Sequence, residues 1–286
     1  MQTSFGDRVA RRTVPPFPAP RRRAIDGPRR TTTGLFRTAG CASPPGAEGS
    51  VVVSKAHPQQ WTINDDDHRP DPAAVAALAA FPTTQIADCG GPVSVVGPGI
   101  VRQAGGRDFC GPALTVWTKP GDILFLLKAP DLARAGDVLV VDGGGRTDAA
   151  VLGDIMSGAL ARIGAVGIAI DGVIRDADGI DGIGLPVFAR GVYPTTASNE
   201  GPGAINVDVV LGGVAVRPGD VVRGDASGLV VVPREHVEEV VRLTQAVEDR
   251  ERVWLDAMEQ GAGLAEATGI DDVIRARREA VGVHLP

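Results

Sequence analysis

Residues 136–171 read GDVLVVDGGGRTDAAVLGDIMSGALARIGAVGIAID, and this stretch decides the fold. GDVLVVD at its start and AVGIAID at its end are short apolar runs typical of buried strands. Between them, residues 148–163 place apolar side chains at helical spacing. A strand, helix and strand in this order predict a right-handed crossover and a parallel strand pair.

The segments around this unit extend the same architecture. Asp71 opens DPAAVAALAAF and Thr83 opens TTQIADCGG, which predict two short helices. GPALTVWT and LPVFARG are typical of strands, and PGDILFLLKAP is typical of a helix opened by Pro-Gly-Asp. After Pro202, short β segments with Gly-rich turns predict a meander or a small barrel. Residues 234–260 predict one long amphipathic helix that ends at Gly261.

Residues 1–70 differ from the rest of the chain. They are rich in Arg and Pro and lack hydrophobic periodicity, so we expect a disordered segment ahead of a single domain at residues 71–286. A basic arm that binds RNA or acidic partners is one interpretation of this segment. A linker, or a translation start upstream of the real domain, is the simpler one.

Composition limits the class of protein. With 286 residues, of which 43% are hydrophobic, the chain can bury a sizeable core and is predicted to be globular and soluble. No apolar run approaches the roughly 20 residues that cross a bilayer, and no secretory signal is recognisable. Three cysteines without metal-ligand spacing favour the cytoplasm. The net charge of -6 offers no general attraction to nucleic acid.

Three segments place polar groups where strands are predicted to end, which is where α/β folds tend to bind ligands. The first, VVDGGGRTD at residues 140–148, could cradle a phosphate or a nucleotide. It lacks both the dinucleotide-binding pattern and the P-loop lysine. A methyltransferase that binds its cofactor at residues 143–145 is one interpretation. A tight turn from strand to helix is the other.

The second segment, LGDIM at residues 152–156, also has two interpretations. If the helix begins near Gly153, the backbone amides of Gly153, Asp154 and Ile155 would face an anion, assisted by the helix dipole. If the helix begins at Asp148, Asp154 is an exposed helical carboxylate. The sequence leaves both starts open.

The third segment, DGVIRDADG at residues 171–179, places an arginine beside a carboxylate just beyond the most apolar strand. Arg175 has the planar donor fork that suits a substrate carboxylate, and Asp176 can hold a hard divalent cation. A surface ion pair is the structural alternative. The scattered histidines form no zinc pattern and no lysine lies in this segment, so oxygen ligands, and with them magnesium or manganese, are favoured over zinc or Schiff-base chemistry.

Several of these segments together resemble one known family. The similar stretches are GDVLVVDGGG, LGDIMSGALARIGAVGIAIDGVIRD, LPVFARG, GVAVRPGDVVRGDASGLVVVP and the upstream TTQIAD, in consistent order over about residues 73–260. The family joins 4-hydroxy-4-methyl-2-oxoglutarate aldolases to regulators of ribonuclease E activity, and its members are often described as demethylmenaquinone methyltransferases. The resemblance implies an α/β fold of the swivelling β/β/α type, with a central sheet or barrel flanked by helices. It also implies a homotrimer or a dimer of trimers, with sites between subunits.

The resemblance assigns roles to individual residues. Arg175 would bind the pyruvyl carboxylate, and Asp176 would bind the divalent metal, Mg2+ or Mn2+. Gly153, Asp154 and Ile155 would supply backbone amides to the substrate, and the Asp154 carboxylate would lie beside a metal-bound water.

The resemblance also assigns a role to the C-terminal helix. An acidic residue from the C-terminal helix of the next subunit would complete the site, and Glu251 is the best match to it. Asp171 and Asp178 become a turn residue and a surface residue.

We therefore expect a class II, metal-dependent pyruvate aldolase. It would cleave 4-hydroxy-4-methyl-2-oxoglutarate or related 2-oxo acids, and it would decarboxylate oxaloacetate through the same enolate. The pair Arg175-Asp176 favours a competent enzyme, because regulators of the proteobacterial type tend to lose the Asp after the Arg. The alternative is a non-catalytic regulator that binds ribonuclease E or another protein. The first 70 residues have no counterpart in the family, and the C-terminal GIDDVIRARREAVGVHLP does not resemble the tail of the aldolases, which leaves the physiological substrate open.

Overall fold

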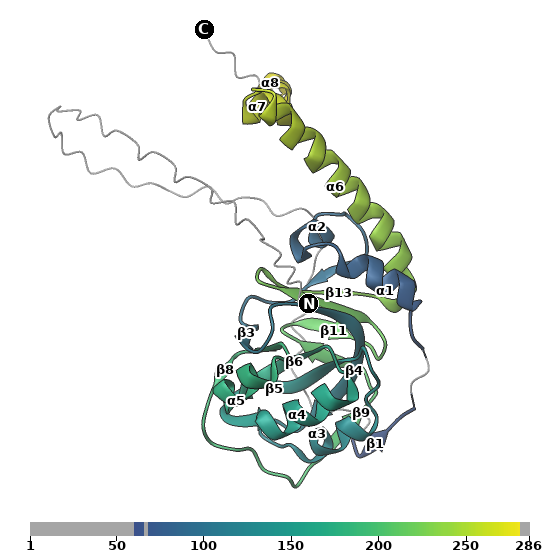
Figure 1. The fold of residues 1–286 in the computed structure, drawn as a ribbon, viewed down its shortest axis with the longest axis vertical. Helices are drawn as coiled ribbons and strands as arrows, with labels where there is room; N and C mark the ends of the chain where they lie inside the picture. Colours follow the sequence, from purple (N-terminus) through teal and green to yellow (C-terminus); the bar gives the residue numbers. More distant parts are fainter. Residues whose placement is uncertain (1–59, 66–67, 281–286) are drawn as a thin grey trace, which may run out of the picture. The chain divides into compact units, whose positions relative to one another are not determined.

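The computed structural model describes residues 60–65 and 68–280, which build a mixed α/β fold around one large sheet flanked by helices (Figure 1). The strands predicted for its centre pair in parallel, in the order β4-β5-β6-β7. Their bounds are β4 (Phe109–Thr118), β5 (Val138–Leu152), β6 (Gly167–Ile174) and β7 (Val187–Ala189). The predicted α/β class and the parallel strand pair are confirmed.

Shorter strands extend this sheet on both sides. The full order is β2-β13-β12-β4-β5-β6-β7-β3, with β8 paired to β6 and β9 paired to β4. β10-β11 and β12-β13 are antiparallel hairpins, which confirms the change to short β segments after Pro202. The bounds are β2 (Ser94–Val95), β3 (Val101–Ala104), β8 (Gly191–Val192), β9 (Gly203–Ile205), β10 (Val209–Leu211), β11 (Val214–Val216), β12 (Val221–Asp225) and β13 (Gly228–Val232).

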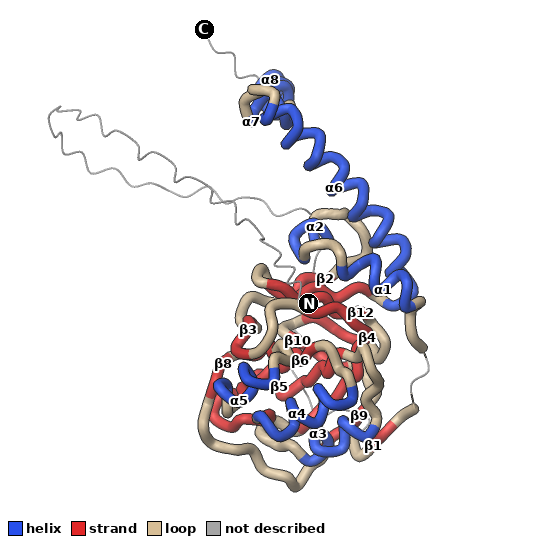
Figure 2. The backbone as a smooth tube through the Cα atoms, in the orientation of Figure 1, coloured by secondary structure: helices blue, strands red, loops and turns tan. Residues whose placement is uncertain are grey.

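Helices cover the sheet in two groups (Figures 1 and 2). α3 (Leu124–Lys128), α4 (Asp154–Ile163) and α5 (Ala177–Ile183) share a core with β4, β5 and β6. α1 (Pro72–Ala79), α2 (Thr83–Ala87) and α6 (Val237–Glu259) share another core with β12 and β13. The remaining helical elements are η1 (Ala129–Asp131), η2 (Arg234–His236), α7 (Leu264–Thr268) and α8 (Ile270–Ala280). Within the described ranges, none of these helices has both the length and the apolar character that a membrane span requires.

The start of α4 decides between the two interpretations of the LGDIM segment. α4 begins at Asp154, and Gly153 is the residue before it. Residues 149–152 instead continue β5, and all four are buried. A strand buried on both faces shows no alternation of apolar and polar residues, so these positions also fit a helical pattern. Of the two starts that the sequence left open, the one near Gly153 is confirmed and the one at Asp148 is wrong.

Residues before Asp71 also join the fold. β1 (Thr62–Ile63) pairs in parallel with β9, and Arg69 forms an ion pair with the buried carboxylate of Asp137. These contacts lie ahead of Asp71, where the sequence pattern placed the start of the domain. The prediction of disorder for residues 1–59 lies outside the described residues.

Candidate functional site

Two of the three candidate segments meet at the carboxyl ends of β5 and β6. Ile174 lies opposite Leu152 in the strand register, and the Arg175 amide donates a hydrogen bond to the Leu152 carbonyl oxygen over 2.9 Å. α4 begins just after β5, and α5 begins just after β6. The parallel pairing therefore brings the LGDIM segment and the Arg-Asp pair to one place.

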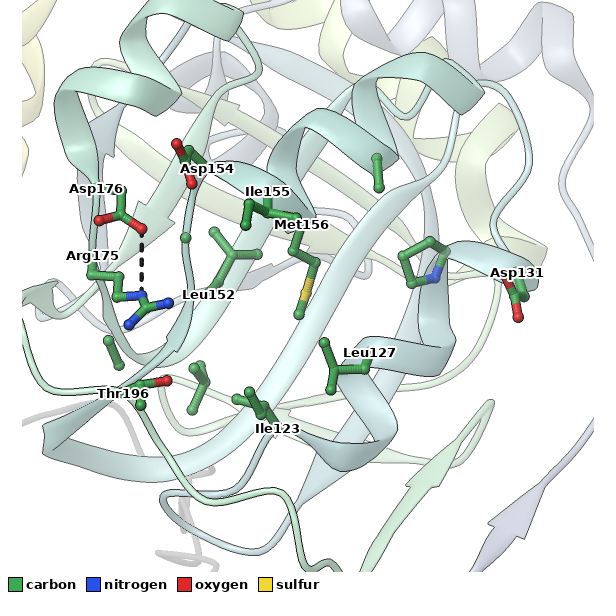
Figure 3. Close-up of a pocket in the computed structure, with 15 residues that line it drawn as sticks. Ile123, Leu127, Asp131, Leu152, Asp154, Ile155, Met156, Arg175, Asp176 and Thr196 are labelled. Atoms are coloured by element: carbon green, nitrogen blue, oxygen red, sulfur yellow. Dashed lines mark ion pairs between the residues drawn. The ribbon is translucent and has the colours of Figure 1, made fainter.

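A cavity of about 410 Å³ opens at these strand ends (Figure 3). Its volume is typical of small-molecule sites. The residues predicted to bind substrate or metal, other than Glu251, all line it: Gly153, Asp154, Ile155, Arg175 and Asp176. The rest of its wall is mostly apolar and includes Ile123, Leu127, Pro130, Met156 and Ala159.

Arg175 and Asp176 lie side by side at the edge of the cavity. Arg175 Nε is 3.3 Å from Asp176 Oδ2, and the two side chains are 40% and 43% exposed. An ion pair this open to solvent contributes roughly 0–1 kcal/mol to stability, so both groups remain accessible to a ligand. Asp176 also has a φ of +56°, which is uncommon outside glycine. Backbone conformations of this kind recur at functional sites.

Gly153 makes room for this pair. A Cβ atom on Gly153 would collide with the Asp176 carboxylate and would lie 3.3 Å from both Cγ and Nε of Arg175. The φ of Gly153 is -138°, a value that any residue adopts, so the lack of space and not the backbone conformation requires glycine here. The first residue ahead of α4 is therefore packed directly against the Arg-Asp pair.

The N-terminal end of α4 forms part of the cavity wall. Gly153 offers no side chain to cap the helix, and its carbonyl accepts hydrogen bonds from the Ser157 amide and hydroxyl over 3.1 and 3.0 Å. The amides of a first helical turn have no partner within the helix, and the helix dipole favours negative charge at this end. Asp154 and Ile155 carry two of these amides and line the cavity. The anion-binding interpretation now has the helix start that it requires.

The Asp154 side chain lies between α4 and α5. A Cβ atom on Gly179 would lie 3.0 Å from Asp154 Oδ2, so this glycine lets the half-buried carboxylate pack closely against α5. In Figure 3, Asp154 lies on the same side of the cavity as Arg175 and Asp176. The three charged residues that the sequence connected by resemblance are thus neighbours in space.

Asp171 corrects one prediction, because it is not a turn residue. It lies within β6 and is buried. Its carboxylate forms an ion pair with Arg190 and accepts a hydrogen bond from the Gly212 amide over 2.9 Å. Asp178, as expected, is exposed and does not line the cavity.

Glu251 does not reach the cavity of its own chain. It lies on α6, where it accepts a hydrogen bond from Gln85 Nε2 of α2 over 2.7 Å. It is not one of the residues that line the cavity. The resemblance placed Glu251 in the site of a neighbouring subunit, and that role stays a prediction.

The glycine-rich segment has a structural role. Residues 143–145 lie inside β5, and the Gly144 amide donates a hydrogen bond to Asp142 Oδ1 over 3.0 Å. β5 continues to Leu152, so the predicted turn from strand to helix is wrong. Among the described elements, no helix begins directly after residues 143–145, and these residues do not line the cavity.

The carboxylates present fit a hard divalent cation. Mg2+ commonly takes one or two protein carboxylates and completes its coordination with water and substrate oxygens. Asp176 offers one such carboxylate, and Asp154 offers a second from the same side of the cavity. In the part of the chain that the structure describes, no three His, Cys, Asp or Glu side chains gather at one point. A divalent cation held by these carboxylates would complete its coordination with water and substrate oxygens.

The sequence did not predict the apolar wall. Leu127 lies on α3, Ile123 is the residue just before α3, and Thr196 comes from the loop after β8. These residues line the same cavity as α4, although they are distant from α4 in the sequence. No local pattern could have identified them, because their own segments carry no polar motif.

The segments that build the cavity are similar to known proteins. The model of the RraA-like family, described as Aldolase/RraA, matches residues 83–231, just over half of the chain. A protein of Halalkalibacterium halodurans named "Putative 4-hydroxy-4-methyl-2-oxoglutarate aldolase" is 40% identical over 132 residues, which cover 46% of this chain and 63% of that relative. A protein of the same name from Ectopseudomonas mendocina is 37% identical over 142 residues, which cover 50% of this chain and 87% of the relative. The chain thus spans less than two thirds of the first relative.

One similar solved structure is described as a member of an RNase inhibitor family and not as an aldolase. The crystal structure of Streptomyces coelicolor RraAS2 is described as "an unusual member of the RNase ES inhibitor RraA protein family". It is 31% identical, with a TM-score of 0.59, and the alignment covers 68% of this chain and 98% of that one.

The family match at residues 83–231 includes the cavity residues Gly153, Asp154, Arg175 and Asp176 but ends before Glu251.

Proposed function

Because the chain belongs to the RraA-like family of aldolases and RraA proteins, we propose that it is a metal-dependent lyase that releases pyruvate from 4-hydroxy-2-oxo acids. The observation that carries this proposal is the meeting of Arg175, Asp176 and the start of α4 in one cavity. The names of two relatives support aldolase chemistry. Oxaloacetate is a second substrate to test, because the loss of carbon dioxide leaves the same pyruvate enolate.

Arg175 binds the carboxylate of the 2-oxo acid. Its guanidinium presents paired N–H donors in a planar fork that matches a carboxylate. The first-turn amides of α4 donate to oxygen atoms at the same end of the substrate. They stabilise the negative charge that develops on the 2-oxo oxygen as the bond breaks.

The C3–C4 bond breaks, and its electron pair remains on C3. The 4-hydroxyl group loses a proton as it becomes a carbonyl, and Asp154 accepts that proton directly or through a water. The carbonyl product leaves, Asp154 returns the proton to C3, and pyruvate follows. Asp176, with Asp154 beside it, would hold Mg2+ or Mn2+, which supplies Lewis-acid stabilisation of the enolate charge when bound.

Release of pyruvate in the presence of Mg2+ tests this proposal. We expect the wild-type protein to form pyruvate from 4-hydroxy-4-methyl-2-oxoglutarate or oxaloacetate, and Arg175→Ala to lower kcat/KM by about 100-fold. Arg162→Ala is the matched control, because Arg162 is an exposed cation in the last turn of α4. A wild-type rate no higher than that of Arg175→Ala would contradict the lyase activity.

A non-catalytic regulator that binds ribonuclease E or another protein is the second candidate. The likeness to Streptomyces RraAS2 supports it. The two functions differ in their dependence on the cavity. Equal affinity of wild-type protein and Arg175→Ala for a ribonuclease, together with no release of pyruvate by either, would favour the regulator.

A further inference from the structure

Residues 60–65 lie along β9, beside the elements that form the apolar wall of the cavity (Figure 1). β1 pairs in parallel with β9, and the Trp61 amide donates a hydrogen bond to the Gly203 carbonyl oxygen over 2.8 Å. The side-chain amides of Asn64 and Asn206 each donate to the backbone carbonyl oxygen of the other residue, over 3.0 and 2.8 Å. Backbone and side-chain hydrogen bonds therefore hold this segment against β9.

The Trp61 side chain contacts both α3 and the loop after β8, residues 193–202. Its ring meets the Phe125 ring of α3 edge to face, with 5.8 Å between the ring centroids and 64° between the ring planes. A Cβ atom on Gly201 would lie 2.7 Å from the Trp61 ring, so this glycine lets the ring lie directly on the loop. Trp61 thus touches both of the elements that supply the apolar wall.

Phe125 lies on the side of α3 that faces away from the cavity. Successive residues of an α-helix are about 100° apart, so Ile123 and Leu127 lie near one another and Phe125 lies about 200° from each. Ile123 and Leu127 line the cavity, whereas Phe125 does not (Figure 3). The Phe125 ring packs instead on Gly203 of β9, where a Cβ atom would lie 2.5 Å from it. The contact between Trp61 and Phe125 therefore supports the wall from behind.

The backbone of Trp61 is also unusual. Its φ is +62°, which is rare for a bulky residue. Such conformations cost free energy and persist where the surrounding contacts fix them. This backbone conformation directs the ring onto Phe125 and Gly201, although the side chain stays 61% exposed. The role of Trp61 is therefore local and not that of a core residue.

We propose that Trp61 is a positioning residue for the substrate, whose ring holds α3 and residues 193–202 in the arrangement that forms the apolar wall. This inference rests on the proposed lyase activity, and it adds a residue outside the family match at residues 83–231. Trp61 does not line the cavity, so it acts through Phe125 and Gly201 and not on the reacting atoms. Because the wall contacts the substrate before and during the reaction alike, loss of this support weakens binding more than chemistry.

Steady-state kinetics of pyruvate release test this role. The full-length protein is assayed with Mg2+ and with whichever of oxaloacetate and 4-hydroxy-4-methyl-2-oxoglutarate the wild type cleaves. We expect Trp61→Ala to raise KM about fivefold and to change kcat by less than about twofold. Trp61→Phe should restore most of the wild-type KM, because a phenyl ring can keep the edge-to-face contact.

Two outcomes separate this inference from the proposed function. An unchanged KM in Trp61→Ala, or a loss confined to kcat, would overturn the inference and leave the lyase activity standing. No pyruvate from the wild type with either acid would overturn both.

Hydrogen exchange tests the cause without any substrate. We expect the amides of residues 124–128 to exchange about tenfold faster in Trp61→Ala than in the wild type, while those of α4 keep their rates. Ile63→Ala is the matched control, because it shortens a 47% exposed apolar side chain of the same segment. It should leave both KM and the exchange of α3 at wild-type values. Equal exchange of α3 in wild type and Trp61→Ala, or an equal rise of KM in Ile63→Ala, would contradict the role of the Trp61 ring.

Discussion

Gly153 controls whether the Arg175–Asp176 pair keeps its position. Replacement of Gly153 by alanine places a methyl group where the Asp176 carboxylate lies. We expect Gly153→Ala to lower kcat/KM for pyruvate release about tenfold or more, because a small displacement of positioned groups is costly to catalysis. Circular dichroism should show an intact fold, since alanine adopts this backbone conformation without strain.

Gly158→Ala is the matched control for that variant. Gly158 lies within α4, the helix that Gly153 precedes, and its Cβ atom would make only an ordinary contact, 3.7 Å from Ile183 Cδ1. Alanine in place of a helical glycine should stabilise the protein by about 0.5–1 kcal/mol and leave activity unchanged. Equal losses of activity in both variants would show that the space around Gly153 has no special role.

Asp176→Asn tests the metal ligand with little change in shape. Asparagine tolerates a positive φ as aspartate does, so the substitution isolates the loss of charge. We expect the affinity for Mn2+, measured by electron paramagnetic resonance titration, to fall about tenfold or more. Asp178→Asn, an exposed neighbour in the same segment, should bind Mn2+ as the wild-type protein does. Unchanged Mn2+ affinity in Asp176→Asn would place the metal elsewhere.

Asp122 ties α3 to the loop after β8, and both elements contribute to the apolar wall. Its carboxylate accepts hydrogen bonds from the Leu124 amide, the Ser198 hydroxyl and the Glu200 amide, over 2.9, 2.8 and 2.7 Å. Burial opposes ionisation of Asp122, but these hydrogen bonds outweigh burial and hold the pKa of the carboxyl below its ordinary value. The folded state therefore favours the charged form of Asp122.

This pKa shift predicts how stability depends on pH. A carboxyl group with a lowered pKa contributes stability that is complete above its unfolded pKa and is lost as pH falls through the folded pKa. We expect Asp122→Asn to be about 1–3 kcal/mol less stable at pH 7, and its Tm to fall less than that of the wild type between about pH 5 and pH 3. Asp131→Asn removes an exposed carboxylate and serves as control. Parallel Tm curves for wild type and Asp122→Asn would contradict this account.

The sequence predicted those elements whose pattern is complete within one continuous segment. α6 has clear helical periodicity, and β4 and β6 are apolar runs bounded by turns. Residues 149–152 were ambiguous because a strand buried on both faces has no alternation. The pairing of β1 with β9 depends on residues far apart in the chain and has no local signal.

In the candidate site, too, some residues have a local sequence signal and others depend on distant segments. Arg175, Asp176 and Asp154 carry recognisable chemistry at strand ends, so the sequence could identify them. The burial of Asp171 could not be predicted, because it depends on Arg190 and Gly212 from other segments.

The chain as a whole presents apolar side chains along its C-terminal helices. Val253, Leu255 and Leu264 are 64%, 57% and 66% exposed. These exposures alone do not define a binding surface, but the prediction that Glu251 serves a neighbouring site requires a homo-oligomer. We expect sedimentation velocity to detect a trimer or a hexamer, and a monomer at micromolar concentration would contradict the shared site.

Mixed oligomers test the shared site directly. Arg175→Ala and Glu251→Gln should each be inactive alone, because each lacks one group of every site. After denaturation and joint refolding, about a quarter of the sites would combine both wild-type groups if the subunits mix at random. We expect pyruvate release to return in the mixture, whereas separately refolded variants stay inactive. No recovery in mixtures shown to contain both subunits would place Glu251 outside the neighbouring site.

A crystal structure with Mn2+ and oxalate, which mimics the pyruvate enolate, tests the central claim most directly. We predict an anomalous peak for Mn2+ beside the Asp176 carboxylate, with oxalate bound to the metal and to the Arg175 guanidinium within reach of the first-turn amides of α4. Mn2+ and oxalate bound away from Arg175 and Asp176, or a cavity that stays empty at saturating concentrations of both, would contradict it.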